Sequence, residues 1–407
     1  MERKAFVSRR LFYFWVMNLI LFDDPDIRIN LLPFTFTRPV ACLRVGILTI
    51  GEKWGKWLHS KPSFKTEAYL QEKYPLETTS DSLLINGAVC PDLKLVDTVK
   101  SLPSGYFLVK GTLLIATRNP ASEMSNQNTV EYPGEVTVID RPWKIFRENG
   151  PQLRIDFALV TSGRKSAPIS DPHTRIYGEQ NIFLEEGVYI RAAILNAENG
   201  PIYLGKNSIV QEGAIIRGGF ALGEEGHINM GAKIRGDVTV GPYCKVGGEV
   251  SNSVLLSYSN KAHDGYLGNS VIGEWCNLGA DTNTSNLKNN YDAVKLWNHS
   301  AQDFADTGLQ FCGLMMGDHS KSSINTMFNT ATMVDVSTNV FGTGFPKKYI
   351  PSFAWGGSNG FITFQPDKAL ETAERVMSRR NVVMSELDKA ILLHVYKITA
   401  SGRIWEK

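Results

Sequence analysis

The sequence predicts a mixed α/β N-terminal domain, an all-β left-handed parallel β-helix of hexapeptide repeats, and a C-terminal α-helix. The β-helix is indicated by an aliphatic residue at every sixth position: Leu204, Val210, Ile216, Leu222, Ile228, Ile234, Val240 and Val246. An α-helix would space apolar residues by three and four, and a half-buried strand by two. A period of six fits a chain that turns a corner after each short strand, with glycines at Gly205, Gly223 and Gly241 easing the corners.

Composition narrows the class of protein. The 407 residues carry a formal net charge of +2, which argues against a nucleic-acid binder that works through a dominant basic field. The five cysteines are odd in number and form no CxxC pair, so we expect a reduced, cytoplasmic protein with no structural metal site.

The first 17 residues form a separate segment. Two arginines precede an apolar run over 11–22, which is too short to span a bilayer. A signal peptide is one interpretation, but acidic residues follow the run where a small-residue cleavage site would stand. We favour residues 1–17 as an N-terminal extension ahead of a natural start at Met17. Asn18 to Phe22 is then the first buried strand.

Residues 18–146 are expected to form a domain, because short apolar runs alternate with polar and Pro-containing segments. The stretch 31–40, LLPFTFTRPV, resembles the early segment of sugar-phosphate nucleotidyltransferases, which implies a substrate contact for Arg38. The Gly-rich loop that brings backbone N–H groups to phosphates in that family does not follow Phe22. A degenerate or purely supporting domain is therefore an equal alternative.

The rest of the chain divides by its periodicity. Residues 147–170 contain Pro and Gly and are interpreted as a linker, and 171–365 as the β-helix, with early members Ile182, Val188 and Ile194. The period is interrupted at 252–265 and 287–308, and such departures tend to carry function. In the last segment, residues 366–407, the stretch 366–399 shows helical spacing, and we expect one amphipathic helix that covers a coil end or edge, followed by a tail.

The histidines allow a metal reading. The γ-class carbonic anhydrases, a hexapeptide-repeat family, hold zinc between coils with three histidines. The candidates here are His227, His263, His299 and His319, but none stand at a close spacing and no carboxylate-rich loop accompanies them. Ligands can converge from separate coils, so this remains the minor alternative; we predict no metal site.

A second constellation points to acyl transfer. KAHDGYLG at 261–268 and LGADTNTSN at 278–286 resemble the acetyltransferase half of the bifunctional N-acetylglucosamine-1-phosphate uridylyltransferase / glucosamine-1-phosphate acetyltransferase family. The resemblance implies that His263 is the catalytic base and that Tyr266 lies in the active site. It also implies that Asn286 contacts the amino-sugar and that Ala280 lines the acetyl-CoA groove.

Weaker parts of the resemblance add further residues. Arg235 corresponds to a sugar-phosphate arginine, and Glu249 falls in a Val-Gly segment that binds substrate. Lys347 and Lys348 are candidates for the CoA phosphates, although solvated surface lysines are the more ordinary reading. The acceptor-contacting lysine of the family is replaced near Ser251-Asn252, which leaves the acceptor's identity open.

The resemblance implies an acetyl-CoA-dependent N-acetyltransferase that acts on an amino-sugar phosphate, as a homotrimer. A second activity, uridylyl transfer with Mg²⁺ to make the sugar nucleotide UDP-N-acetylglucosamine, is implied for the N-terminal half. The residue types suit the chemistry, because a histidine that titrates near neutrality can take a proton from an amine. The alternative is a non-catalytic sugar-nucleotide-binding or scaffold protein; neither reading calls for nucleic acid or a membrane.

Overall fold

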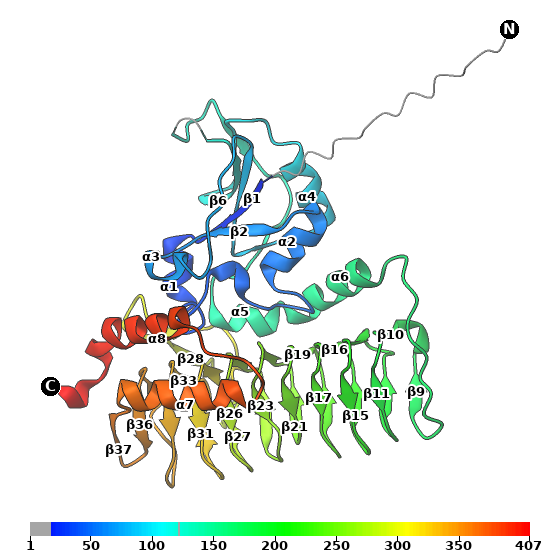
Figure 1. Cartoon of the computed structure of the whole chain (residues 1–407), viewed down its shortest axis with the longest axis vertical. Helices are drawn as coiled ribbons and strands as arrows, with labels where there is room; N and C mark the ends of the chain where they lie inside the picture. Colours follow the sequence, from blue (N-terminus) through cyan, green and yellow to red (C-terminus); the bar gives the residue numbers. More distant parts are fainter. Residues whose placement is uncertain (1–17, 121–122) are drawn as a thin grey trace.

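The computed structural model describes residues 18–120 and 123–407. An N-terminal α/β domain sits on one face of a left-handed parallel β-helix, and helices follow at the C-terminus (Figure 1). The predicted fold class is therefore confirmed. The predicted extension, residues 1–17, lies outside the described residues. Within the described ranges, no helix has the length and apolar character needed to cross a membrane.

The N-terminal domain is built on a mixed six-stranded sheet, in which the predicted first strand, Asn18–Phe22, lies second from one edge. Strand β1 runs parallel to β2 and β3, and β6 is antiparallel to both β3 and β5. The sheet order is β2 (Pro62–Lys65), β1 (Asn18–Phe22), β3 (Ser82–Asn86), β6 (Leu113–Arg118), β5 (Phe107–Lys110) and β7 (Thr129–Glu131). A small ladder joins β4 (Val89–Cys90) to β8 (Thr137–Val138), and the helices are α1 (Pro25–Asn30), α2 (Ile50–Leu58), α3 (Ala68–Gln71) and α4 (Leu93–Lys100).

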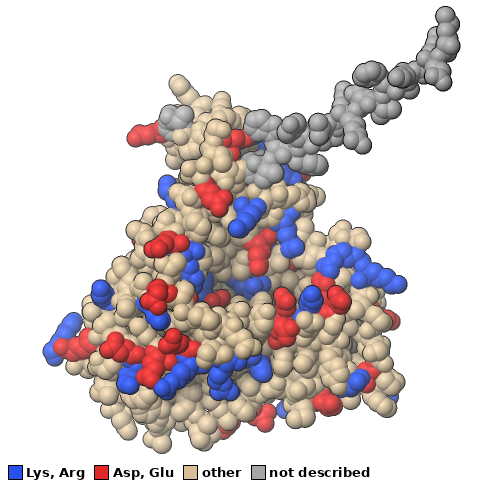
Figure 2. All heavy atoms as spheres, viewed as in Figure 1, with Lys and Arg blue, Asp and Glu red and all other residues tan. Residues whose placement is uncertain are grey.

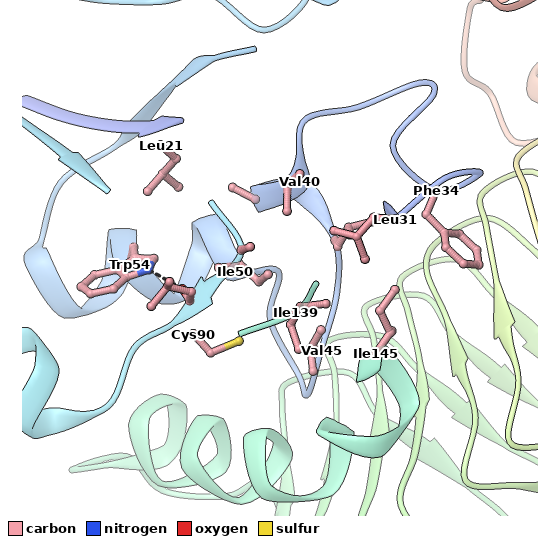
Figure 3. Packing of buried hydrophobic residues seen from close by; sticks show 14 of the residues in the cluster. Leu21, Leu31, Phe34, Val40, Val45, Ile50, Trp54, Cys90, Ile139 and Ile145 are labelled. Atoms are coloured by element: carbon pink, nitrogen blue, oxygen red, sulfur yellow. Dashed lines mark hydrogen bonds between the residues drawn. The ribbon is translucent and has the colours of Figure 1, made fainter. Parts of the chain in front are cut away.

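Helix α2 provides much of this domain's core. Its N-terminus is fixed by a capping box in which Thr49 and Glu52 bond each other's backbone N–H groups. Trp54 is fully buried and its indole N–H donates to the carbonyl of Val89 at 2.8 Å, so the ring is both packed and satisfied (Figure 3). Leu21 from β1 and Ile50 from α2 belong to the same cluster, which anchors the helix to the sheet.

The β-helix has three faces, each a parallel sheet with one strand per coil, except that β37 pairs antiparallel with β36 at the end of face two. Face one lies beneath the N-terminal domain: β10 (Ile182–Leu184), β13 (Ile202–Leu204), β16 (Phe220–Leu222), β19 (Val238–Val240), β22 (Val254–Leu255), β25 (Val271–Ile272), β30 (Met315–Met316), β33 (Met333–Val334), β35 (Tyr349–Ile350). Face two comprises β11 (Tyr189–Ile190), β14 (Ile209–Val210), β17 (His227–Ile228), β20 (Lys245–Val246), β23 (Asn260–Lys261), β26 (Asn277–Leu278), β31 (Lys321–Ser322), β34 (Asn339–Val340), β36 (Ala354–Gly357) and β37 (Gly360–Thr363). Face three comprises β9 (Arg175–Tyr177), β12 (Ile194–Asn196), β15 (Ile215–Arg217), β18 (Lys233–Arg235), β21 (Glu249–Ser251) and β24 (Tyr266–Gly268), continued by β27 (Asn283–Thr284) and β32 (Met327–Phe328).

The predicted aliphatic series from Leu204 to Val246 occupies the interior of the β-helix, and each of its members is at most 1% exposed. The earlier members predicted for this series, Ile182, Val188 and Ile194, do not continue it, although Ile182 is itself buried in the same interior cluster. Their places are taken by Leu184, Ile190 and Leu195, which pair with the interior positions of the next coil. Ile190 and Leu195 are five residues apart where the repeat has six, and the corner after Leu195 is longer than the others. Extending the six-residue spacing from Leu204 towards the N-terminus therefore gives the wrong positions.

The two predicted interruptions turn out differently. Residues 252–265 do not leave the coil, because β22 and β23 continue faces one and two. Lys261 takes the inward position at which an aliphatic residue was expected, which hid the strand from the six-residue pattern. The segment 287–308 does leave the coil, and it forms the hairpin β28 (Lys295–Asn298) and β29 (Asp303–Asp306).

The corner between faces one and two carries a column of residues with positive φ, one per coil. Tyr243, Tyr258, Trp275 and His319 adopt φ between 57° and 61° there. Their rings stack with centroid separations of 4.8, 4.0 and 6.3 Å. An apolar column of this kind on the outside of a coil needs a cover.

The C-terminal segment supplies that cover with two helices instead of the one predicted. Helix α7 (Pro366–Ser378) and helix α8 (Glu386–Ile398) bury Met377 and Val395 against Trp275 and Phe353 of the corner. Figure 1 shows α7 crossing the strands of face two, so it runs along the β-helix and does not close its end. Short 3-10 turns follow at Ala400–Gly402 and Ile404–Glu406.

Helices α5 (Pro142–Arg147) and α6 (Asn149–Thr161) lie between the two domains (Figure 1). Most of the predicted linker 147–170 is therefore helical. Asn149 accepts from Gly46 N and from the Thr239 hydroxyl, and its amide donates to the carbonyl of Asp237. One side chain thus bonds both the N-terminal domain and face one.

Candidate active site

His263 stands at the corner between face two and face three, in the turn that joins β23 to β24. Its side chain is exposed, and in the described part of the chain no hydrogen bond to its imidazole is formed. The ammonium of Lys261 donates to the backbone carbonyl of His263. The turn is thereby held from inside the coil while the imidazole is left open to a ligand.

A cavity of about 460 Å³ opens beside this corner. It is lined mostly by polar residues from four successive coils: Gln211, His227, Asn229, Met230, Lys245, Gly248, Ala262, His263 and Asp264. The amide of Asn229 donates to the carbonyl of Ala262 at 2.8 Å, a bond that reaches past the intervening coil of β20. Burial and nearby Lys245 lower the pKa of His227, so this second imidazole is biased toward its neutral form.

Next to the corner, on face three, a chain of hydrogen bonds involves two of the predicted residues. The Asn286 amide donates to the Tyr266 hydroxyl at 3.0 Å and to Asn269 Oδ1 at 2.8 Å. The Tyr266 hydroxyl is also 3.0 Å from the hydroxyl of Ser251. Ser251 and Asn269 were not predicted. Ser251 could have been found by counting whole coils, because it pairs with Gly268 of the Tyr-Leu-Gly motif.

The glycine of that motif has a physical reason. A Cβ built on Gly268 would lie 2.3 Å from the Tyr266 hydroxyl and 2.8 Å from Asn286 Nδ2. Only glycine therefore lets the phenol fold back over the strand to meet the asparagine. The motif forms one unit in which the third residue makes room for the first.

Arg235 and Glu249 lie on the same face, in the two coils before Tyr266. The guanidinium contacts Glu249 Oε1 from Nε at 3.2 Å and from Nη2 at 3.1 Å. Glu249 pairs with Tyr266, while Arg235 pairs with Ser251 and with Arg217. The Arg235 side chain is 61% exposed, so it can exchange its carboxylate for a phosphate of a ligand. Arg217, one coil earlier, was missed although it lies 18 residues before Arg235.

The residues predicted to meet CoA are separated. Ala280 lies in the turn of the next coil directly beside His263, where Asp281 N donates to the carbonyl of Asp264 at 3.1 Å. Lys348 lies at a different corner, where its ammonium donates to the carbonyl of Lys295 at 3.1 Å and rests 5.5 Å from the Phe304 ring. Lys347 beside it is exposed. The structure thus brings Ala280, and neither lysine, to the histidine.

Arg38 is buried between the domains. Its guanidinium pairs with Asp318 and with Glu274 at 3.1 Å, and the hydroxyl of Thr37 donates to the same Asp318 oxygen. Burial opposes the charge on Arg38, but the two carboxylates outweigh it and raise its pKa. This environment favours a role in joining the domains.

The end of β1, where a nucleotidyl-transfer site would stand, is occupied by protein contacts. Asp23 accepts from Val40 N, from the Arg28 guanidinium and from the Thr66 hydroxyl, and Asp24 caps α1. Both oxygens of Asp23 are therefore engaged, and Asp24 Oδ1 is engaged at the helix N-terminus, which leaves Asp24 Oδ2 as the one oxygen of this pair open to Mg²⁺. With no Gly-rich loop after β1 to hold phosphates, the residues present here are a poor fit for a magnesium-nucleotide site.

The four candidate zinc-binding histidines do not come together. His299 is buried and 3.1 Å from Asp335, and His319 is half-buried at the aromatic corner, where desolvation lowers its pKa to about 3. His227 and His263 share one cavity. Across residues 18–120 and 123–407, no three His, Cys, Asp or Glu side chains are grouped so that they could hold a metal ion.

Known proteins resemble both halves of this architecture. Residues 19–165 match the family described as sugar nucleotidyl transferase. The chain is 39% identical over 79 residues to the bifunctional protein GlmU of Trichodesmium erythraeum, covering 19% of this chain and 16% of that protein. It is 29% identical over 175 residues to GlmU of a Cyanothece species, covering 42% and 34%. The matched regions span about a third or less of these relatives.

Two solved structures are similar in outline. One is the polySia specific acetyltransferase NeuO, which is 13% identical with a TM-score of 0.25, and the match covers 58% of this chain and 99% of that one. The other is an Arabidopsis UDP-N-acetylglucosamine acyltransferase, which is 12% identical with a TM-score of 0.18, and the match covers 60% of this chain and 95% of that one. At these TM-scores neither alignment bears on function. The fold and the sequence matches define a transferase-family protein in which a nucleotidyl transferase-like domain is joined to a hexapeptide β-helix. Over part of its length the chain is similar in sequence to GlmU proteins.

Proposed function

We propose that the β-helix domain transfers the acetyl group of acetyl-CoA to the amine of an amino-sugar phosphate resembling glucosamine-1-phosphate. The observation that carries the proposal is the open imidazole of His263 beside the Tyr266–Asn286 hydrogen-bond chain, with the exposed Arg235 on the same face. These are a base, a polar platform and a cation, which an amino-sugar phosphate requires together.

In the proposed reaction the amine nitrogen of the sugar attacks the thioester carbonyl carbon, and His263 takes a proton from that amine. The carbon–sulfur bond breaks, the thiolate leaves and is protonated, and an amide remains on the sugar. Arg235 would hold the sugar phosphate after releasing Glu249, and Tyr266 with Asn286 would orient the sugar ring. General-base help of this kind is typically worth about 10²- to 10⁴-fold in rate.

Thiol release from acetyl-CoA in the presence of glucosamine-1-phosphate tests this function. His263→Ala should lower the rate by about 10²-fold or more. His173→Ala, which changes an exposed histidine before the first coils, is the matched control and should leave the rate unchanged. Absence of thiol release by the wild-type protein with every amino-sugar phosphate tried, or full activity in His263→Ala, would refute the proposal.

A second candidate function is uridylyl transfer by the N-terminal domain, in UDP-N-acetylglucosamine synthesis. It is favoured by the family match over residues 19–165 and opposed by the engaged Asp23 carboxylate at the end of β1. Pyrophosphate formation from UTP and N-acetylglucosamine-1-phosphate, with and without Mg²⁺, decides it. A domain without that activity would be a supporting one. Sugar-nucleotide binding without either reaction would favour the non-catalytic scaffold.

We also propose a homotrimeric, cytoplasmic protein. Apolar side chains are exposed on face three and at its corner with face two: Ile215 at 44%, Met230 at 71%, Ile324 at 66% and Met327 at 39%. Apolar surface gathered beside a candidate site is typical of a subunit interface. Light scattering should give three times the chain mass, and Met230→Glu with Ile324→Glu should yield monomers; a monomeric wild type would refute the assembly.

A further inference from the structure

A second groove, about 460 Å³ in volume, lies between face two and the end of α7. Its floor is a ladder of adjacent outward residues on successive coils, Lys245, Asn260, Asn277 and Lys321. Neighbouring strands are about 4.8 Å apart, so the two lysines at the ladder's ends stand roughly 14 Å apart. Its wall is formed by Arg379 and Arg380, which follow directly after α7.

These four cations have no acidic counterpart. Among the described residues no ion pair joins Lys245, Lys321, Arg379 or Arg380 to a carboxylate, and Arg380 bonds only the amide oxygen of Asn260, at 2.8 Å. Burial and the two arginines lower the pKa of Lys245, which records the mutual repulsion. Figure 2 shows basic side chains gathered over the end of α7 that lies nearest β23. Uncompensated like charges around a groove destabilise the free protein and are relieved by an anion.

The groove is continuous with the cavity at His263, because Lys245 and Ala262 line both. We propose that the groove between α7 and face two binds the diphosphate of a ligand whose reactive end reaches His263. Amide donors between cations suit a chain of phosphates, since the ladder offers charge at its ends and hydrogen bonds between them. CoA and nucleoside diphosphates share this chemistry. If the ligand is CoA, the inference rests on the proposed acyl transfer. The arrangement of charges in the groove does not depend on that proposal.

Calorimetric titration of the full-length protein with CoA, UDP and inorganic pyrophosphate, at low and high salt, tests the site. Arg379→Gln with Arg380→Gln should weaken diphosphate binding by about tenfold or more, as expected for the loss of charge-assisted hydrogen bonds. The matched control changes two basic residues of α7 that pair with Glu371, Lys368→Gln with Arg375→Gln, and should bind as the wild type does. Melting curves of both double variants separate a lost site from a lost fold.

Binding of CoA alone would identify a thioester donor as the ligand, and binding of UDP a nucleotide; either, if weakened in Arg379→Gln with Arg380→Gln, supports the groove. Unchanged affinity in that variant, or no diphosphate binding by the wild type at millimolar concentration, would overturn it. The outcome is independent of turnover. If CoA binds in the groove but no thiol is released, the binding site is supported and the acyl transfer is refuted. If thiol is released but Arg379→Gln with Arg380→Gln binds with unchanged affinity, the acyl transfer is supported and the binding site is refuted.

Discussion

Replacing Arg38 measures how strongly the joint between the two domains stabilises the chain. The Arg38 and Asp318 side chains are each 4% exposed, so Arg38→Met leaves a buried carboxylate without its cation. Such a change typically costs about 3–5 kcal/mol. Asp318 keeps its bonds from the Thr37 hydroxyl at 2.5 Å and from Glu274 N at 2.8 Å, so we expect the lower end, about 3 kcal/mol. At an unfolding entropy of about 2.1 cal/mol/K per residue over the 407 residues, the melting temperature should fall by roughly 3–4 °C.

Differential scanning calorimetry gives this fall directly. Arg118→Met is the control, because the Arg118–Asp81 pair has two hydrogen bonds but its side chains are 27% and 20% exposed, and we expect a cost below about 1 kcal/mol. Adding Asp318→Asn to Arg38→Met should recover part of the loss by removing the unpaired charge. The reasoning is refuted if Arg38→Met costs no more than Arg118→Met. Lost pyrophosphate formation at an unchanged melting temperature would instead place Arg38 in a nucleotide site.

Three further predictions concern the β-helix. Ile216→Ala should cost about 2–5 kcal/mol in urea unfolding, while Ile215→Ala, one position away and 44% exposed, should cost under about 0.5 kcal/mol; equal costs would contradict the assigned interior. Gly268→Ala should slow thiol release about tenfold or more with little change in melting temperature, because its Cβ would displace the Tyr266 hydroxyl by steric overlap at 2.3 Å; an unchanged rate would separate that hydroxyl from function. Burial lowers the pKa of Lys261 from 10.5 to about 8, so the folded state gives up a proton that the unfolded state keeps, and stability should rise between pH 8 and 10.5 by roughly 3 kcal/mol. Burial also lowers the pKa of Lys321 to about 8, so Lys261→Met should reduce the rise in urea titrations without abolishing it, and an undiminished rise would contradict the Lys261 contribution.

The β-helix was predictable because its signal is local. One side chain per strand must enter the interior, so the sequence from Leu204 to Val246 repeats the requirement every six residues. Prediction failed where that requirement was relaxed. A five-residue step after Ile190 moved the early coil out of count, and Lys261 entered the interior as a long side chain whose ammonium reaches a carbonyl. Neither departure changes the coil, but each hides it from a pattern of aliphatic residues.

The site was predictable only where a motif is contiguous. His263, Tyr266 and Gly268 are close in sequence, and the resemblance that assigned them depended on that spacing. The bond between Arg38 and Asp318 joins residues 280 positions apart, and no periodicity links them. The position of α7 is a similar case, because its apolar stripe predicts a cover but not what is covered. The stacked column of Tyr258, Trp275 and His319 decides that question, and it exists only once the coils are stacked.

Stacking also explains how distant segments can form one site on this fold. Adjacent coils place a residue directly beside the one a full turn earlier, so Arg217, Arg235 and Ser251 form one column and Lys233, Glu249 and Tyr266 the next. Each coil therefore contributes one or two side chains, and the strands themselves hold them in register. The corner that carries His263 lies at the edge between two faces. A side chain there can approach a ligand from that edge while residues of the adjacent face contact the same ligand. The base is expected at a corner for this reason, and the groups that hold the substrate on the flat faces to either side.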